Sequence, residues 1–276
     1  MSRNRQTVFI PEAEVGQAIT SPSLTSKPTF RTEDAAALSI SHKSPWEYYE
    51  KRFPMKFWCS FAIITSKPHR GGDPRMMRTL TGAKSDEQLQ IIRHIFHRNI
   101  VQNIELFASG HEPGSYFIVS EYMPTSLSHL YGCPEYPSEP AFSSILYQIL
   151  SAIEFLCGEG LVHEAIACTS VLMTFSGEVK IGDIECCRRG GDFAKFLDSF
   201  NRIAMVLMDK RKTPDAAIGL TRIDKWSGEA VDFFTSIRMQ APLTKYLNHS
   251  FMSRRSKEEL KWLVLFVMVS AEHSRV

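Results

Sequence analysis

The order of its local patterns is the feature that most constrains how this 276-residue chain folds. Segments rich in aromatic and β-branched residues, which are typical of strands, come first, at 56–66 and on both sides of a Gly/Pro turn within 103–123. From residue 138 the pattern becomes helical, with a serine cap, a long apolar stripe and a glycine stop near residue 160. A strand-rich half followed by a helix-rich half predicts an α+β chain of two lobes.

Shorter segments complete this outline. Residues 85–97 carry apolar side chains at helical spacing, and Ser85 or Asp86 is a suitable N-cap. The segments "SVLMTF" and "EVKIGDI" are separated by Ser-Gly, which predicts a hairpin. Residues 1–44 are rich in Ser, Thr and Pro without a sustained period, and we expect them to be disordered. The remaining apolar segments predict three more helices, at 193–211, 227–239 and 242–252.

Charge and cysteine content exclude several classes of function. With 32 basic and 30 acidic residues the net charge is +2, which gives no electrostatic case for a nucleic-acid partner. The six cysteines form no CxxC pair and no spacing to histidine typical of zinc sites. No apolar leader opens the chain, so we expect reduced thiols in an intracellular, cytoplasmic protein. A redox role for the neighbouring Cys186 and Cys187 stays open.

One apolar run near the C-terminus requires a choice between membrane and core. Residues 260–271, "LKWLVLFVMVSA", number about a dozen, fewer than the ~20 that a helix needs to cross a bilayer. The run therefore predicts a buried or interface helix, and no membrane span is expected.

Several segments, taken in order, resemble the eukaryotic protein kinase domain over about residues 56–252. "HIFHRNIVQNIELF" resembles the stretch after the regulatory helix, and "QILSAIEFLCGEGLVH" resembles the long helix before the catalytic loop. "LTKYLNHSFM" resembles the closing helix of the domain. The resemblance implies a two-lobed, kinase-like domain at 45–256. It would have a small β-rich N-lobe at about 45–120, a larger helical C-lobe at about 124–256, and an apolar helix or tail at 257–276.

The same resemblance implies where a nucleotide would lie. "YFIVSEYMPTSLSHL" is similar to the strand and hinge of a kinase, with Ser120 as the gatekeeper and Glu121, Tyr122 and Met123 in the hinge. Together with Leu172, the residues Ser120, Glu121 and Met123 would line an adenine pocket if nucleotide binds.

Kinases use a glycine-rich loop over the phosphates and a strand lysine paired with a helix glutamate. This chain has no glycine between Gly16 and Gly71, so that loop is absent. When "FAII" is aligned with V-A-I-K, Ile64 takes the lysine position, and Gln88, nine residues before His97, takes the glutamate position. A displaced lysine, Lys56 or Lys67, stays open as a substitute.

The catalytic loop departs from the kinase pattern as well. His163, Glu164 and Ala165 stand where H-R-D is expected, and Ala165 at the base position has no group that accepts a proton. Ser170 replaces the asparagine that holds magnesium, whereas Asp183 in "KIGDIE" matches the metal-binding aspartate of D-F-G. The resemblance leaves two roles open for Asp183: holding a metal with Ser170, or capping a turn.

The segment after Asp183 is short for a kinase. Asp198 resembles the buried aspartate that opens the central helix of the C-lobe, and it follows Asp183 by only 15 residues. The resemblance implies a shortened activation segment with no platform for a peptide substrate, while His163 and Asp198 would be kept as framework residues.

These departures lead to three hypotheses. The first is a pseudokinase, which we expect to act as a binding scaffold or regulator for protein partners, another kinase among them. The second is a nucleotide-binding, weakly active Ser/Thr-type protein kinase that binds ATP and Mg through Asp183 and a displaced lysine. The third is a degenerate gene copy without function.

Overall fold

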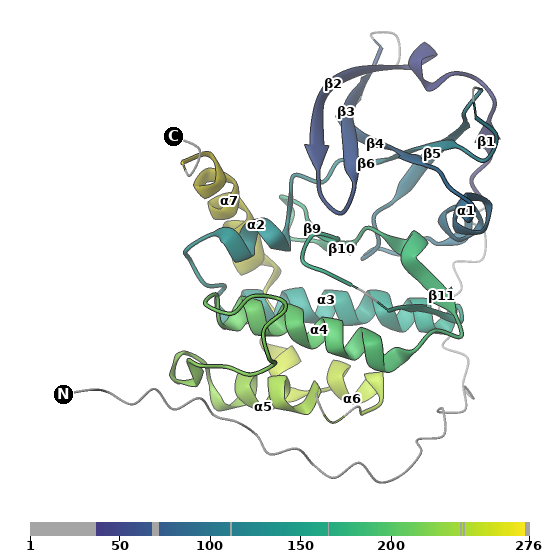
Figure 1. Ribbon diagram of the computed structural model, residues 1–276. Coiled ribbons are helices and arrows are strands. Elements are labelled where there is room, and N and C mark those ends of the chain that lie inside the picture. The colour runs from purple at the N-terminus through teal and green to yellow at the C-terminus, as the bar shows by residue number, and fades with distance from the viewer. Residues whose placement is uncertain are drawn as a thin grey trace.

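The computed structural model describes residues 37–67, 72–110, 112–164, 166–237, 239 and 241–273. It has a β-rich first lobe and a helical second lobe, joined by a short connection after residue 121 (Figure 1). The predicted α+β, two-lobed, kinase-like fold is therefore confirmed.

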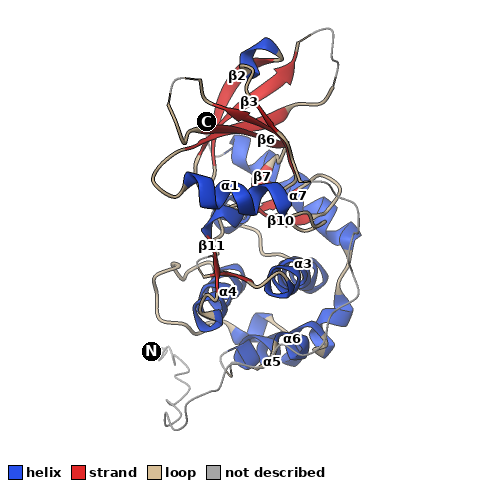
Figure 2. Cartoon of the chain, turned by 90° about the vertical axis from the view of Figure 1, so that its right-hand side faces the viewer, coloured by secondary structure: helices blue, strands red, loops and turns tan. Residues whose placement is uncertain are grey.

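A twisted sheet and one helix, α1 (Ser85–His94), make up the first lobe. The sheet has six strands in the order β1-β5-β6-β4-β3-β2, and all neighbours are antiparallel except β1 and β5. α1 lies between this sheet and the second lobe (Figure 2). The strands are β1 (Ile40–Ser41), β2 (Tyr49–Lys56), β3 (Ser60–Ser66), β4 (Arg75–Leu80), β5 (Asn103–Ala108) and β6 (Tyr116–Glu121).

The single strand expected at 56–66 is instead the end of one hairpin strand and all of the next. Residues 57–59 form the turn between β2 and β3, closed by a hydrogen bond from the Phe57 N–H to the Cys59 carbonyl. The aromatic residues of this turn satisfy the composition of a strand, but at the turn the Phe57 side chain is buried and the Trp58 side chain is partly buried. The hairpin predicted within 103–123 is confirmed, and Gly114 supplies its positive φ of 75°.

The second lobe is built around two long helices, α3 (Glu139–Gly158) and α4 (Phe193–Met208), which lie side by side. Ser138 caps α3 as predicted, because its hydroxyl accepts a hydrogen bond from the Ala141 N–H. The other helices are α2 (Leu127–Gly132), α5 (Gly228–Ile237), α6 (Leu243–Leu247) and α7 (Lys257–His273), and the short 3-10 helices are η1 (Pro45–Glu47), η2 (Ile184–Cys186), η3 (Ile223–Lys225) and η4 (Ser250–Arg254).

Short strands line the top of the second lobe, facing the sheet. The hairpin predicted from "SVLMTF" and "EVKIGDI" is present as β9 (Val171–Met173) paired with β10 (Val179–Ile181), with β7 (Thr125–Ser126) at its edge. β8 (Leu161–His163) pairs with β11 (Cys187–Arg189). Since α4 begins at Phe193, the segment after Asp183 holds only η2 and β11, which confirms the shortened activation segment.

Two sequence expectations concern segments at the margins of this fold. Residues 1–36 lie outside the described part of the chain, but Ile40–Ser41 pairs in parallel with Leu106–Phe107, so the sheet begins before residue 45. Among the described residues, α3 is the one helix whose length and mean hydropathy of 1.4 satisfy a test for membrane spans. It is also the mostly buried central helix of the second lobe, and such helices pass the same test.

Candidate functional site

The turn between β2 and β3 points toward β9 and β10 of the second lobe (Figure 1). Side chains of both lobes meet there in a buried apolar group, which we call the cleft cluster. The first lobe contributes from this turn, from β3 and from β4; the connection contributes Met123, and β9 contributes Leu172. The cleft cluster consists of Phe57, Phe61, Ile63, Met76, Val101, Met123 and Leu172.

Aromatic contacts hold the cleft cluster together across the lobes. The ring of Phe57 packs edge-on against Phe61, with centroids 6.0 Å apart, and against His129 of α2 at 6.2 Å. Every member of the cluster is buried. The side chains that would form the floor of an adenine pocket, Met123 and Leu172, are therefore covered by the chain itself.

Trp58 extends this closure to the loop that begins with Gly182. A Cβ atom built on Gly182 would overlap the indole ring of Trp58, so only glycine fits beneath the ring. The indole N–H donates to Glu185 Oε1 at 3.3 Å, which ties the β2–β3 turn to the residue in the glycine position of D-F-G.

Glu185 is the centre of a buried polar group. Its Oε2 lies 3.1 Å from a guanidinium nitrogen of Arg78, and both side chains are almost fully buried. The Arg78 guanidinium also lies 6.0 Å from the centroid of the Trp58 ring. From α1, the amide of Gln88 donates to the Glu185 carbonyl at 3.3 Å. Residues from β4, α1 and the β2–β3 turn thus converge on one carboxylate.

This geometry corrects the assignment of Ile64 to the strand-lysine position. Ile64 lies on β3, fully buried against the sheet, and pairs with Arg75 on β4. The strand that directly precedes α1 is β4, and its cation in the cleft is Arg78. Gln88 does lie on α1 facing this group, so the pair expected between a strand cation and a helix glutamate is replaced by Arg78 with Glu185.

Asp183 is held inside the second lobe. Its Oδ1 accepts a hydrogen bond from His163 Nε2 at 2.7 Å, and both side chains are buried. Asp183 precedes η2 but makes no side-chain capping bond there, so turn capping is not its role. Its carboxylate is satisfied by the histidine of the catalytic loop.

The other expected metal ligand, Ser170, is also engaged locally. Its hydroxyl donates to the Ala167 carbonyl at 3.1 Å and accepts from the Ala167 N–H at 3.2 Å. Among the described residues no group of three or more His, Cys, Asp and Glu side chains could hold a metal ion. Ala165, at the base position, lies outside the described residues.

Residues of the hinge lie where the sequence predicts them, on β6 and the connection. Ser120 is buried on β6, and its hydroxyl lies 3.5 Å from the Met76 carbonyl. Both carboxylate oxygens of Glu121 lie 2.8 Å from the Lys180 ammonium of β10, which links the hinge to the second lobe.

Glu164, in place of the catalytic-loop arginine, binds the start of α4. Its carboxylate accepts from the Asp192 N–H at 2.8 Å and lies 3.5 Å from the Lys195 ammonium. The hydrogen bond from Asp192, followed by the nearby Lys195 charge, lowers the pKa of Glu164. An anion at the N-terminus of a helix is favourable.

Asp198 is not the buried framework aspartate that its sequence context indicates. Its side chain is 52% exposed and pairs with Arg202 one turn later on α4. The link between α4 and the catalytic loop is made by Ser199 instead, whose hydroxyl donates to the Glu164 carbonyl at 3.3 Å. The residue of α4 that faces the catalytic loop is therefore Ser199, one position later than expected, and Asp198 faces solvent.

The neighbouring cysteines have no features of a reactive pair. Burial, followed by the nearby carboxylates, raises the pKa of Cys186 to about 11, and burial raises the pKa of Cys187 further. A thiol needs a lowered pKa to be an effective nucleophile at neutral pH. The described cysteines are all free thiols.

A nucleotide with magnesium, which the resemblance to kinases implies, does not fit these residues. Met123 and Leu172, the residues expected to line an adenine pocket, are buried in the cleft cluster, and Trp58 lies over Gly182 in the loop that would face the phosphates. Arg78 and Asp183, the groups that would meet a phosphate and a metal, are paired with Glu185 and His163.

Comparisons with known proteins agree with the fold. The protein kinase domain family matches residues 76–200, from β4 into α4. The chain is 28% identical to the serine/threonine-protein kinase SSN3 of Gibberella moniliformis, over 60% of this chain and 38% of that relative. It is 25% identical to the serine/threonine-protein kinase STK11 of Gallus gallus, over 56% of this chain and 34% of the relative. The chain thus spans less than two fifths of the length of these relatives.

Proposed function

We propose that this chain, whose residues 76–200 match the protein kinase domain family, works as a pseudokinase: a kinase-like scaffold or regulator that binds protein partners without transferring phosphate. One observation carries the proposal. The charged groups nearest to a kinase's chemistry, Arg78 and Asp183, are paired with the chain's own Glu185 and His163, beside a cleft closed by its own side chains.

The expected loss of rate follows from the missing groups. Removal of a positioned general base costs about 10²–10⁴ in rate, and Ala165 supplies none. Removal of one preorganised charge costs about 10²–10³. One loss of each kind would bring a typical kinase rate of about 1–100 s⁻¹ below roughly 10⁻² s⁻¹, although such effects are not additive.

Binding to partners would use the surfaces that this fold keeps rigid. α1 is fixed against the second lobe through Gln88 and Glu185, so its outer face is presented in one orientation. A preorganised surface loses little conformational freedom when a partner binds. We propose protein partners, another kinase among them, for this reason.

The alternative is a weakly active Ser/Thr-type kinase that binds ATP and Mg²⁺. It requires Asp183 to leave His163, Phe57 to leave the cleft cluster, and a displaced lysine such as Lys56 to replace the paired Arg78. These rearrangements would expose buried apolar and charged groups together, which is costly.

A transfer assay tests the proposal. The purified 276-residue chain is incubated with γ-labelled ATP, Mg²⁺ and a mixture of protein substrates, next to an Ala165→Asp variant that restores the carboxylate. We expect no transfer above background from either chain, because the cleft stays closed. Transfer by the unaltered chain at a rate typical of kinases would refute the proposal, and transfer by the variant alone would identify residue 165 as the one missing part.

A further inference from the structure

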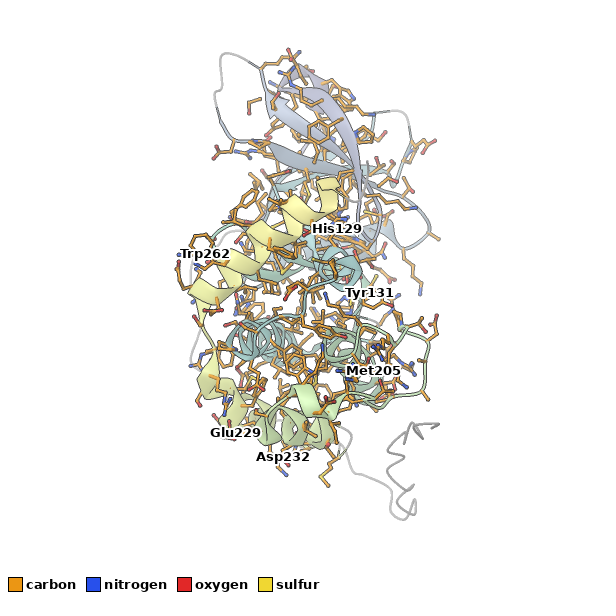
Figure 3. The ribbon with its side chains drawn as sticks, turned by 90° about the vertical axis from the view of Figure 1, so that its left-hand side faces the viewer. His129, Tyr131, Met205, Glu229, Asp232 and Trp262 are labelled. Atoms are coloured by element: carbon orange, nitrogen blue, oxygen red, sulfur yellow. The ribbon has the colours of Figure 1, made fainter. Side chains whose placement is uncertain are left out.

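The C-terminal helix α7 has two apolar faces, and within the described part of the chain one of them packs against the second lobe while the other is largely exposed. Its inner face packs on the second lobe through buried residues, namely Leu260, Leu263, Val264 and Val267. Its outer face carries Trp262, Leu265, Phe266 and Val269, which are 65%, 44%, 42% and 57% exposed. Figure 3 shows α7 in front of the other elements on this side of the molecule, with Trp262 at its margin.

Charges at the start of this outer face are already balanced. The Glu258 carboxylate pairs with Lys261 at 2.9 Å, and Lys257 pairs with Glu178 of the β9–β10 hairpin at 3.2 Å. The same hairpin turn supports the first turn of α7, since a Cβ on Gly177 would lie 2.7 Å from the Lys257 carbonyl oxygen. The outer face is therefore a fixed apolar stripe and not a loosely attached tail.

We propose that this stripe, Trp262, Leu265, Phe266 and Val269, is covered by the same stripe of a second copy of this chain, with the two α7 helices antiparallel. A two-fold interface requires that residue i meets residue j and residue j meets residue i. A two-fold axis between Leu265 and Phe266 meets this condition for all four side chains. It places Trp262 of one copy on Val269 of the other, and Leu265 on Phe266.

The area of the stripe fits this occupant. Taking roughly 200 Å² for a fully exposed large side chain, the four exposed fractions amount to about 400 Å² of apolar surface for each copy. Single proteins rarely leave a larger patch uncovered, and patches of ~300–600 Å² are often functional. Two copies would bury about 800 Å² of apolar surface. Because homodimer interfaces are about 65% apolar, the total is roughly 1,200 Å², at the lower end for stable interfaces.

Antiparallel pairing is also favoured by the helices themselves. The positive N-terminal end of each macrodipole would lie beside the negative C-terminal end of the other. The side chains alternate in size along the stripe, so that the large Trp262 meets the smaller Val269. This inference does not depend on the proposed function, since dimers form equally well from active and inactive chains.

The mass of the 276-residue chain in solution tests the inference. In analytical ultracentrifugation across a hundredfold range of concentration, we expect a shift from the chain mass of 31.4 kDa to twice that value. Trp262→Glu and Phe266→Glu are expected to remain monomeric throughout. The matched control is Phe53→Glu on β2, where the side chain is 50% exposed but lies in the first lobe, and it is expected to dimerise as the unaltered chain does.

Circular dichroism of each variant establishes that α7 and the rest of the fold are retained. A chain that is monomeric at all concentrations would overturn the inference. So would a dimer that survives Trp262→Glu and Phe266→Glu in correctly folded variants, or binding to lipid vesicles that those variants abolish while the free chain stays monomeric.

Cross-linking tests the register separately. A cysteine introduced as Leu265→Cys would face residue 266 of the other copy and lie within one residue of its own counterpart across the two-fold axis, so oxidised glutathione should produce a disulfide-linked dimer. Lys245→Cys on α6, remote from α7 in sequence, measures the background from the native thiols. Equal cross-linking of both variants would overturn the antiparallel register.

Discussion

Replacing Glu185 with glutamine tests whether the buried charge pair holds the two lobes together. The glutamine keeps the shape of the side chain and an oxygen that accepts the Trp58 N–H, but it removes the charge and the oxygen that accepts from Arg78. The Arg78 side chain, 4% exposed, would then be a buried cation without its partner. Removing one member of a buried pair costs about 3–5 kcal/mol, because the remaining charge is not compensated. For a domain of this size, 3 kcal/mol corresponds to a fall of about 6–12 °C in Tm.

The assay is urea unfolding followed by far-UV circular dichroism, applied to Glu185→Gln, Arg78→Met and the double variant. Replacing both members of a buried pair by uncharged groups is often neutral. We therefore expect the free energy of unfolding of the double variant to lie within about 1–2 kcal/mol of that of the unaltered chain. Its loss of stability should be much smaller than the sum of the losses of the two single variants.

Two results would refute this reasoning. A loss of less than about 1 kcal/mol for Glu185→Gln would mean that water reaches Arg78 and that the pair behaves as an exposed one. A double variant as unstable as the two single variants combined would mean that the carboxylate and guanidinium act independently.

Three further predictions concern the cleft and the first lobe. Gly182→Ala should lower the free energy of unfolding by about 1–3 kcal/mol, because its methyl group overlaps the Trp58 ring. Urea unfolding measures this loss. In a Trp58→Ala background the same glycine substitution should cost less, and an unchanged cost would mean that the methyl group does not clash with the ring. ATP with Mg²⁺ should leave the Tm unchanged in a thermal-shift titration; a concentration-dependent rise would show that Phe57 can leave the cleft cluster. His97 has a pKa lowered by burial and by Arg98, so its neutral form favours the fold. Stability should therefore fall as the pH drops below the unfolded value of about 6.5, and His97→Gln should weaken this dependence in denaturation curves at several pH values.

Local patterns were sufficient to predict most elements of the fold. Ser138 starts α3 because a hydroxyl at that position can accept a helix N–H, and this depends only on nearby residues. The β9–β10 hairpin likewise depends on a short turn, in which Gly177 has a φ of 77°. The hinge residues Ser120 and Glu121 could be placed because their segment follows a regular strand.

The buried network at Glu185 could not be predicted in the same way. Arg78 lies 107 residues before its partner in the sequence. In addition, β4 has arginines as its first and fourth residues, which makes it a less obvious strand than an apolar segment. Aligning the apolar "FAII" segment with V-A-I-K therefore places the lysine position at Ile64 on β3, whereas the strand that leads into α1 is β4. One signal was present: a basic residue seven positions before the first residue of α1 at Ser85, on the strand that leads directly into that helix.

The exposed position of Asp198 was not predictable from the sequence for a related reason. On a helix, a shift of one residue turns a side chain by about 100°, which is enough to move it from the core to solvent. Sequence spacing alone did not distinguish Asp198 from Ser199, and only the packing of α4 against the catalytic loop decides which of them faces inward.

Glu164 has a consequence for phosphorylation near the catalytic loop. Many kinases are switched on when a phosphate is added to a long loop and is received by an arginine. Here the receiving position already carries a negative charge that is bound to the Asp192 N–H and to Lys195. A phosphate arriving nearby would be repelled, and the few residues between η2 and α4 leave little loop to reorganise. Phosphorylation of this short segment would therefore lack the arginine that receives the phosphate in such kinases.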